Sequence, residues 1–419
     1  MKLDEEKLRG MLCEMTKKRL RAALLSFALL PILVFALYFA RAYGDREAAM
    51  EPRPSHQVDL QLLYSFLVRG TEDSALGAPF KVYPIDVDGH HATLVEYPFG
   101  SSPRRTDTSS VPRGIALYVH GFSDYYFHKE MAEKMDSAGY AFFAVDLHGY
   151  GRSIREGEPR SDMRFASEFF AEIDYAVEMG WHMVKSNLEH KVYDTVRDSS
   201  NEVITKALLS IKRPPSILVA HSQGGLITSL YMEEGRQDKF GAVVMNSPFL
   251  EMNFGIAVRK FVYPLVASVA LYFPDVSIGS TGNPNYANSL YKGEKGEWDY
   301  NTDWKPFQRP TTYLHWVRAV YKAQSKVHGG LHIASPILVM HSGCSVKAEE
   351  WTDEYTRCDG ILDARLIRDA APKLGPNVKT LQVDGALHDV FLSKKEVRDG
   401  AYGSALRFID ESLAGSQAR

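Results

Sequence analysis

A single serine between a predicted strand and a predicted helix constrains this chain more than any other feature. Residues 216–219 (Ser-Ile-Leu-Val) are typical of a buried strand, and residues 226–232 (Leu-Ile-Thr-Ser-Leu-Tyr-Met) favour a helix. Ala-His-Ser-Gln-Gly-Gly joins them at residues 220–225. The small residues let a tight turn close, and such a turn lifts the Ser222 hydroxyl clear of the backbone. The pattern indicates a nucleophilic serine, although Ala220 replaces the first glycine of the strict Gly-x-Ser-x-Gly pattern; an ordinary Ser-Gly turn is the alternative.

Strands and helices alternate on both sides of this turn. Apolar segments typical of buried strands recur at residues 114–119, 140–145, 240–245, 336–340 and 378–383. Helices are expected at residues 129–138 and 162–190, and an antiparallel hairpin at residues 80–85 and 91–97. This alternation predicts an α/β fold, in which helices cover both faces of a mostly parallel sheet.

Two segments interrupt the alternation. Residues 191–213 form a polar insertion before the serine-bearing strand. Residues 250–334 are rich in aromatic side chains and contain the apolar run 261–273. An insertion of 85 residues is too long for a plain loop, so it is expected to be a cap over the active site. A separate interaction module is the alternative.

The N-terminal region predicts insertion into a membrane. Residues 22–40 form an uncharged, mostly apolar run of 19 residues, which as a helix would reach about 28 Å, close to the thickness of a bilayer core. Lys17, Lys18, Arg19 and Arg21 stand directly before this run, so the N-terminus is expected in the cytoplasm and the main domain outside it. The run is longer than the apolar region of a usual signal peptide, which favours a retained anchor. Secretion after cleavage, near the Ala-Arg-Ala at residues 40–42, is the alternative.

Composition narrows the classes of function. The net charge of −3 gives no reason to expect a nucleic-acid partner, and the chain has neither a phosphate-binding loop nor a complete dinucleotide fingerprint, so no cofactor is expected. Cys344 and Cys358 lie 14 residues apart in the main domain. In an oxidising compartment they could form a disulfide, and two unpaired core thiols are the alternative.

A nucleophilic serine needs a base and an acid that orients the base. His388 follows the last predicted strand, from which a loop can reach back over Ser222. The acid is expected between serine and histidine, in the chain order of one known type of triad. Asp359 is the preferred acid because it opens the Asp-x-Ile-Leu sequence at residues 359–362. Asp363 is the alternative, or it caps the N-terminus of the next helix.

Two backbone amides are expected to form the oxyanion hole. One belongs to Gln223, directly after the serine, and the other to Phe122, in the loop after an earlier strand. His120 is expected to fix that loop. His328 and His332 have the i, i+4 spacing of metal ligands, but the glycines between them break a helix, so no metal site is expected.

Four motifs together resemble the α/β-hydrolase superfamily, and within it the branch of monoacylglycerol lipases, lysophospholipases and serine aminopeptidase-like proteins. They are Val-His-Gly-Phe at 119–122, Asp-Leu-His-Gly-Tyr-Gly-Arg-Ser at 146–153, His-Ser-Gln-Gly-Gly at 221–225 and Leu-His-Asp at 387–389. The resemblance covers residues 78–413 and implies Ser222, Asp359 and His388 as the triad, with a cap between the sixth and seventh strands. Ala220, the segment from Cys344 to Cys358, and the 191–213 insertion depart from the pattern.

The expected organisation follows from these features. It comprises a cytoplasmic leader (1–21), a transmembrane anchor (22–40), a tether and lead-in (41–77), a hydrolase core in two parts (78–249 and 335–413), a cap (250–334) and a tail (414–419).

The expected function is cleavage of carboxylic esters of acyl lipids, such as monoacylglycerols or lysophospholipids. An aminopeptidase or amidase would use the same triad, with Glu294, Glu297 or Asp299 binding the substrate amine. A non-catalytic binding protein on this fold is the alternative from another class. The sequence carries no expectation about the oligomeric state.

Overall fold

The central element of the computed structural model is a nine-stranded sheet within the described residues, which are 44–52, 57–106, 109, 111–196, 200–280 and 282–417. In spatial order its strands are β1 (Thr71–Glu72), β2 (Lys81–Val87), β3 (His90–Tyr97), β5 (Tyr140–Asp146), β4 (Gly114–Val119), β6 (Ser216–His221), β7 (Phe240–Asn246), β10 (Ile337–Ser342) and β11 (Val378–Val383). From β5 to β11 all neighbours are parallel, whereas β1, β2 and β3 add an antiparallel edge. The predicted α/β class is therefore confirmed.

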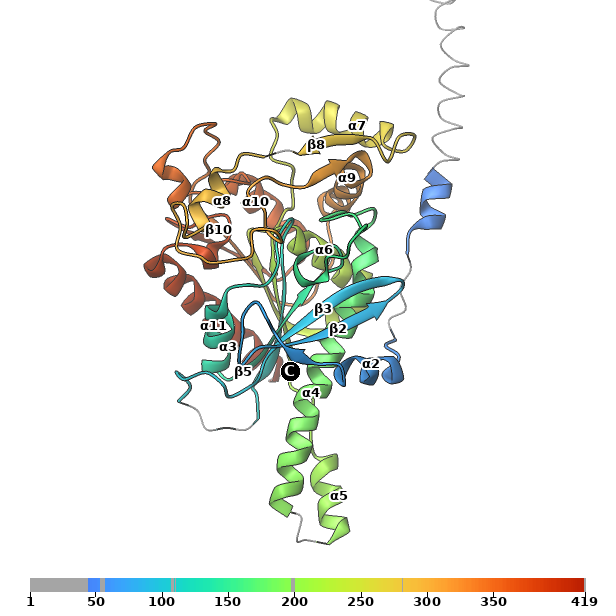
Figure 1. Ribbon diagram of the computed structural model, residues 1–419, viewed down its shortest axis with the longest axis vertical. Coiled ribbons are helices and arrows are strands. Elements are labelled where there is room, and N and C mark those ends of the chain that lie inside the picture. The colour runs from blue at the N-terminus through green and yellow to red at the C-terminus, as the bar shows by residue number, and fades with distance from the viewer. Residues whose placement is uncertain are drawn as a thin grey trace, which may run out of the picture.

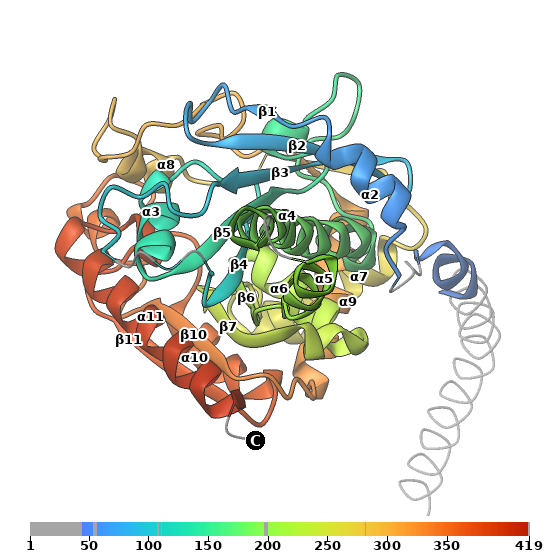
Figure 2. The same ribbon diagram turned by 90° about the horizontal axis from the view of Figure 1, so that it is seen from below.

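Helices cover both faces of the sheet (Figure 2). One face packs against α3 (Lys129–Ser137) and α11 (Lys395–Gln417), and the other against α2 (Leu60–Leu67), α4 (Phe170–Val196), α6 (Gln223–Tyr231) and α10 (Ala364–Ala370). The central strand β4 shows why its sequence is apolar throughout. Ile115 and Leu117 join the hydrophobic core on the α4 face, while Ala116 and Tyr118 join the core on the α3 face.

Helices α4 and α5 (Asn201–Leu209) form an arm that projects from the sheet at the end opposite the cap (Figure 1). The helix expected at residues 162–190 instead begins at Phe170, after a 3₁₀ turn over Ala166–Phe169, and continues to Val196. The polar insertion expected at 191–213 is therefore the last turns of α4 followed by a second helix. No side chain of α5 is buried, which explains why its sequence is not that of a core helix.

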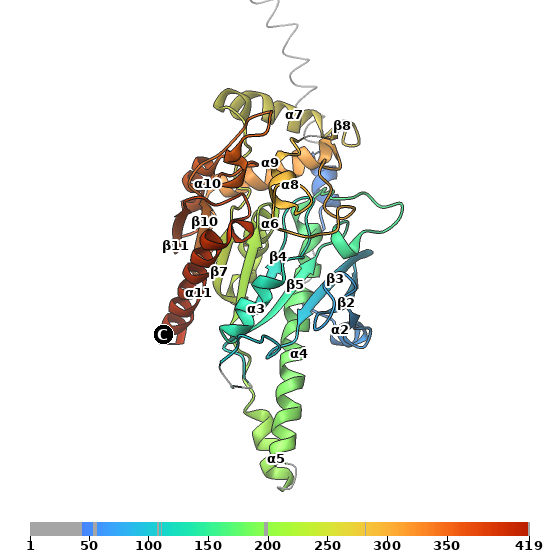
Figure 3. The ribbon, with the colours of Figure 1, turned by 60° about the vertical axis from the view of Figure 1, so that its left-hand side comes forward.

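Residues 250–334 lie over the carboxyl ends of the parallel strands (Figure 3). Their elements are η5 (Val258–Val262), α7 (Tyr263–Val269), β8 (Ser277–Ser280), α8 (Asn285–Leu290), β9 (Thr311–Tyr313) and α9 (Leu314–Gly329), with β8 and β9 paired antiparallel. We call this segment the cap. A cluster of aromatic residues joins it to the core, since Tyr286 and Tyr300 pack with Tyr125 and Phe127.

The described chain begins beside the cap. Residues 44–50 form a helix within the segment 41–77, for which the sequence predicts only a tether and lead-in. Glu47 in this helix accepts hydrogen bonds from Arg318 of α9, at 2.6 Å from Nε and 2.7 Å from Nη2. The anchor predicted at residues 22–40 lies outside the described residues. Within the part of the chain that the structure describes, no helix combines the length and the hydrophobicity needed to cross a bilayer.

Candidate active site

Ser222 occupies a sharp turn between the end of β6 and the start of α6. Its backbone has φ 50° and ψ −116°, a conformation that side chains rarely adopt and that marks a strained elbow. The neighbouring glycines are sterically required. A Cβ atom on Gly224 would lie 2.3 Å from the carbonyl oxygen of His120, and one on Gly225 would lie 2.7 Å from Cβ of Pro248. The turn is thus packed tightly against two adjacent loops while the serine faces the cap.

His388 lies within hydrogen-bond distance of both proposed partners. Its Nε2 is 3.0 Å from Oγ of Ser222, and its Nδ1 is 2.9 Å from Oδ2 of Asp359. With Nδ1 protonated, the ring donates to the carboxylate and accepts the hydrogen bond of the serine hydroxyl. All three side chains are buried, with Ser222 only 8% exposed. The loop after β11 is fixed in turn, since the amide of Leu387 donates to Oγ of Ser393.

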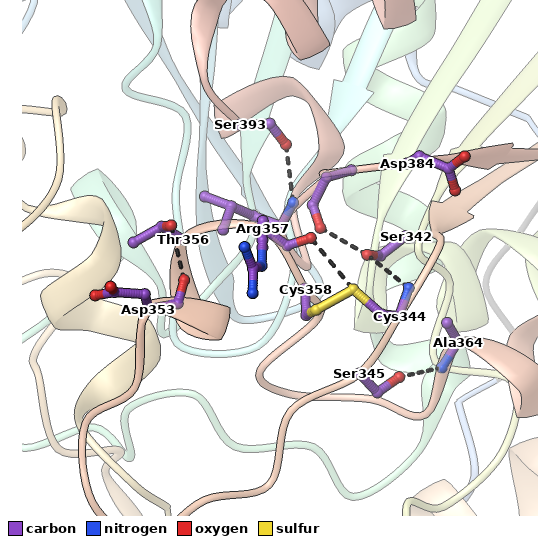
Figure 4. The surroundings of a disulfide bond; sticks show 12 residues. Ser342, Cys344, Ser345, Asp353, Thr356, Arg357, Cys358, Ala364, Asp384 and Ser393 are labelled. Atoms are coloured by element: carbon purple, nitrogen blue, oxygen red, sulfur yellow. Dashed lines mark hydrogen bonds between the residues drawn. A yellow bond between two sulfur atoms is a disulfide. The ribbon is translucent and has the colours of Figure 1, made fainter.

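Asp359 is positioned by its backbone hydrogen bonds and by a disulfide at the residue before it; Figure 4 shows that disulfide, between Cys344 and Cys358. Its amide donates to the carbonyl oxygen of Cys344, its carbonyl accepts from the amide of Val346, and its neighbour Cys358 forms a disulfide with Cys344. The second carboxylate oxygen, Oδ1, accepts from the amides of Ile361 and Leu362 at 2.8 and 2.7 Å. The carboxylate therefore has one fixed orientation, with Oδ2 directed to the imidazole.

Asp363, the alternative acid, caps a helix and does not contact His388. It is the N-cap of α10, where Oδ1 accepts from the amide of Arg365, and it also forms an ion pair with the Arg365 guanidinium at 2.9 Å. These hydrogen bonds lower the pKa of Asp363, the Arg365 side chain having the largest effect. The structure does not bring Asp363 to His388.

The amides chosen for the oxyanion hole are free to bind a ligand. Gln223 is the first residue of α6, where amides have no partner within the helix, and Phe122 lines the pocket beside Ser222. Within the described residues neither amide donates a hydrogen bond. His120 holds the Phe122 loop, because its Nε2 accepts from the amide of Leu147 at 3.1 Å.

A buried polar network lies beneath the triad. Ligand atoms of Asp124, His221 and Asp389 lie within 4.8 Å of one another. Lys305 of the cap already occupies Asp124 at 2.7 Å, so this group is an ion-pair network rather than an open cation site. Burial lowers the pKa of His221 to about 4, which keeps its ring neutral. The other pair considered, His328 and His332, is directed to Leu250 and Glu233 respectively and does not converge.

The pocket above Ser222 is largely apolar, with a volume of about 570 Å³. Its wall includes Phe122, Met252, Val262, Val266, Phe307 and Trp316, most of them from the cap. Lys305 and Arg309 are its cationic residues, and Asp124 is its one carboxylate among the described residues.

Sequence reasoning missed Asp124, Lys305 and Arg309. Asp124 follows the predicted strand at 114–119 closely, which is a usable signal for an active-site polar residue. The two cap residues lie in an irregular loop, where no periodicity indicates which side chains face inward.

Ser222 lies between a strand and a helix and is hydrogen-bonded to His388, which in turn contacts the buried carboxylate of Asp359. On a parallel sheet with this strand order, such an arrangement defines a serine hydrolase of the α/β-hydrolase fold. Residues 110–394 match the family described as serine aminopeptidase, S33, and the chain belongs to that family. A comparison with curated protein sequences finds no match.

The chain is similar to several solved structures, and one with a TM-score above 0.5 supports the fold. A soluble variant of monoglyceride lipase from Saccharomyces cerevisiae, in complex with a substrate analogue, superposes with a TM-score of 0.52 at 16% identity, covering 81% of this chain and 97% of the lipase. A monoacylglycerol lipase from Paleococcus ferrophilus gives a TM-score of 0.45 at 18% identity, covering 72% and 96%. A carboxyl esterase from Bacillus coagulans gives 0.48 at 15%, covering 80% and 99%.

Proposed function

We propose that this protein is a membrane-associated serine esterase that cleaves carboxylic esters of acyl lipids through an acyl-enzyme. The observation that carries the proposal is the large apolar pocket that opens onto the hydroxyl of Ser222. An apolar wall of this size suits a hydrocarbon chain, since burial of each methylene contributes about 0.8 kcal/mol.

The geometry supports the following steps. His388 takes the proton of Ser222 as the serine oxygen attacks the ester carbonyl carbon. Asp359 holds the ring with Nδ1 protonated and stabilises the imidazolium that forms. The amides of Phe122 and Gln223 donate to the developing oxyanion. The alcohol leaves with a proton from His388, and water, deprotonated by the same imidazole, then releases the carboxylic acid and restores the serine.

Among the described residues, none of the carboxylates considered for binding a substrate amine is placed to do so, which disfavours the aminopeptidase alternative. Of the carboxylates considered for that role, Glu297 pairs with Arg398 at 2.8 Å, Asp299 pairs with Lys292, and Glu294 is exposed. None of the three lines the pocket, and Asp124, which does, is paired with Lys305. A cationic substrate amine would instead meet the positive charge of Arg309.

Labelling and turnover test the proposal. The purified full chain should react with a fluorophosphonate probe and hydrolyse a panel of acyl esters faster than matched amides, while Ser222→Ala does neither. Absence of labelling would remove the enzymatic proposal and leave the non-catalytic binding protein. Faster turnover of amides than of esters would favour the peptidase.

The exposed face of the cap supports the membrane part of the proposal. Large apolar side chains are exposed on η5, α7 and β8 and the segments around them: Phe254, Ile256, Phe261, Leu265, Phe273 and Ile278. Phe261 and Leu265 are 73% and 64% exposed. So many neighbouring exposed apolar groups mark an interaction surface. We call it the apolar cap face, and its proposed occupant is a lipid bilayer.

The place where the described chain begins favours a bilayer over a protein partner. Arg318 donates to Glu47 in the helix at residues 44–50 and, through Nη1, to the carbonyl oxygen of Ala267 in α7 at 2.8 Å. The described part of the chain therefore begins next to α7, and the apolar run at residues 22–40 ends four positions before Gly44. An anchor there would hold the apolar cap face against the same membrane.

The proposed location is the extracytoplasmic side, with the N-terminus in the cytoplasm. The basic residues before the apolar run and the disulfide between Cys344 and Cys358 both support this orientation. Protease protection of the full chain in sealed vesicles tests it: the catalytic domain should lie on the side opposite residues 1–21. A signal peptide would instead give a mature chain that lacks residues 22–40.

A further inference from the structure

Arg309 is a charged residue in the wall of the substrate pocket. It stands two positions before β9 in the cap, and its carbonyl oxygen accepts a hydrogen bond from Ser280 at the end of β8. Its side chain packs along Gly282, where a Cβ atom would lie 3.2 Å from Cδ of Arg309. The two-stranded ribbon of the cap thus holds this arginine in the pocket that also contains Ser222.

The guanidinium has no counter-ion among the described residues, in which it makes neither an ion pair nor a side-chain hydrogen bond. The other cation of the pocket, Lys305, is neutralised by Asp124 at 2.7 Å. Asp359 exerts an electrostatic attraction on Arg309, but its oxygens are occupied by His388 and two backbone amides. The pocket therefore carries one positive charge that the protein itself does not balance.

An unbalanced charge in this position is costly, because removal from water is not compensated by a partner. Burial lowers the pKa of Arg309, with Tyr286 and Asp359 opposing the effect only in part. A guanidinium still remains protonated at neutral pH. Its planar donors suit a pair of anionic oxygens, as found in a phosphate or a carboxylate.

We propose that Arg309 binds an anionic group on the alcohol part of the ester substrate, while the acyl chain lies against the apolar wall. The inference rests on the proposed esterase function and narrows its substrate class from acyl esters in general to acyl esters of an anionic alcohol. The anion belongs to the alcohol part because an acyl chain offers hydrocarbon only. Phosphate and carboxylate share the required chemistry.

Binding can be measured without turnover. Hexadecyl phosphate, hexadecyl hemisuccinate and hexadecanol have the same chain and differ in the head group, and Trp316 in the pocket wall reports on occupancy by fluorescence. The full chain with Ser222→Ala should bind at least one anionic compound about 10- to 100-fold more tightly than hexadecanol, the gain expected of a charged hydrogen-bonded pair. The stronger of the two anions identifies phosphate or carboxylate as the group recognised.

Arg309→Gln should remove this preference, and Arg309→Lys should retain part of it. For turnover, the expected change is a fall of about 10- to 100-fold in the ratio of kcat/KM between 1-acylglycerol 3-phosphate, or 1-acylglycerol 3-hemisuccinate, and 1-acylglycerol, for cleavage of the same long acyl chain and carried mainly by KM. Arg368→Gln, an exposed arginine of α10 outside the pocket, is the matched control and should leave the ratio unchanged.

Equal binding of hexadecanol and both anions by the protein with intact Arg309 overturns the inference, and this measurement does not depend on whether the Arg309 variants fold. An unchanged ratio in Arg309→Gln also overturns it. Failure of the esterase proposal would look different: the anionic amphiphile would bind through Arg309 while no ester is hydrolysed.

Discussion

The edge of the parallel sheet and the cap contribute to the site in different ways. Ser222, Asp359 and His388 each follow a strand or stand in a loop held by backbone hydrogen bonds, so their mutual geometry is set by the sheet. Lys305 and Arg309 come from a cap loop and are placed by contacts with distant residues. The sheet therefore sets the geometry of the reactive groups, whereas the cap supplies the cationic residues of the pocket wall.

Replacing the acid of the triad is predicted to reduce activity more than any other change proposed below. Asp359→Asn should lower kcat by about 10⁴-fold, because an amide side chain favours the wrong tautomer of His388. Asp363→Asn is the matched control, since it alters a helix cap four residues away, and asparagine is itself a good N-cap. Steady-state kinetics on one acyl ester measure both variants. Loss of activity in Asp363→Asn with retention in Asp359→Asn would reverse the assignment of the acid.

The second prediction concerns the buried ion pair between Lys305 of the cap and Asp124 of the core. Lys305→Met leaves Asp124 charged and unpaired, which should reduce the free energy of unfolding by about 3–5 kcal/mol at pH 7. Although burial alone would raise it, Lys305 and nearby groups lower the pKa of Asp124 to about 2, below its value of roughly 3.9 in the unfolded chain. The pair therefore stabilises the fold above about pH 4, and its contribution is lost as the pH falls toward 2.

Urea unfolding across pH 3–7 checks this prediction. The difference between the native protein and Lys305→Met should be largest at neutral pH and should shrink in acid. Adding Asp124→Asn to Lys305→Met should recover much of the loss, because no unpaired charge remains. A pH-independent difference would mean that Lys305 acts through packing alone.

The disulfide between Cys344 and Cys358 is predicted to stabilise the fold at the loop that carries Asp359. Replacing Cys344 and Cys358 together with serine should lower the free energy of unfolding by about 3 kcal/mol, since the closed loop spans about 15 residues. Calorimetry on the oxidised protein and on the variant measures the change. Equal stability would show that the hydrogen bonds of Asp359 with Cys344 and Val346 hold the loop without the covalent link.

The contrast between the sheet edge and the cap also explains which features of the site could be predicted from the sequence. The strand before Ser222 and the small residues after it encode a local turn, so that the serine could be identified from local pattern alone. The choice of Asp359 over Asp363 depended on the Asp-x-Ile-Leu sequence at residues 359–362, since both acids lie in the expected place along the chain. The hydrogen bonds that distinguish the two acids come from Ile361, Leu362 and Arg365. The order of residues along the chain therefore narrows the candidates for the acid to these two but does not show which of them contacts His388.

Features that depend on distant contacts could not be predicted. Residues 44–50 have few apolar groups, and their helix is held by the ion pair between Glu47 and Arg318, 271 positions apart. The arm of α4 and α5 has a polar surface, so hydrophobic periodicity in its sequence does not distinguish these helices from a loop. The inward direction of Arg309 depends on the pairing of β8 with β9, two short strands separated by 30 residues.

The smallest expected effect concerns the apolar cap face. In the full chain in lipid vesicles, Phe261→Ser with Leu265→Ser should lower turnover of a long-chain ester in the bilayer by about tenfold, since two large apolar groups no longer enter the interface. Turnover of a short, water-soluble ester should hardly change, because both side chains point to solvent rather than to Ser222.

The arm offers the matched control for this prediction. Val203 and Leu209 on α5 are 47% and 81% exposed, at the end of the molecule far from the cap (Figure 1). Val203→Ser with Leu209→Ser removes similar exposed apolar area but should leave turnover of both esters unchanged. If the arm variant instead lowered turnover of the bilayer ester while the cap variant did not, α5 would be the membrane contact and the proposed orientation of the cap would be wrong. If both variants lost activity on the soluble ester as well, the effect would be one of folding, which thermal unfolding of each variant measures directly.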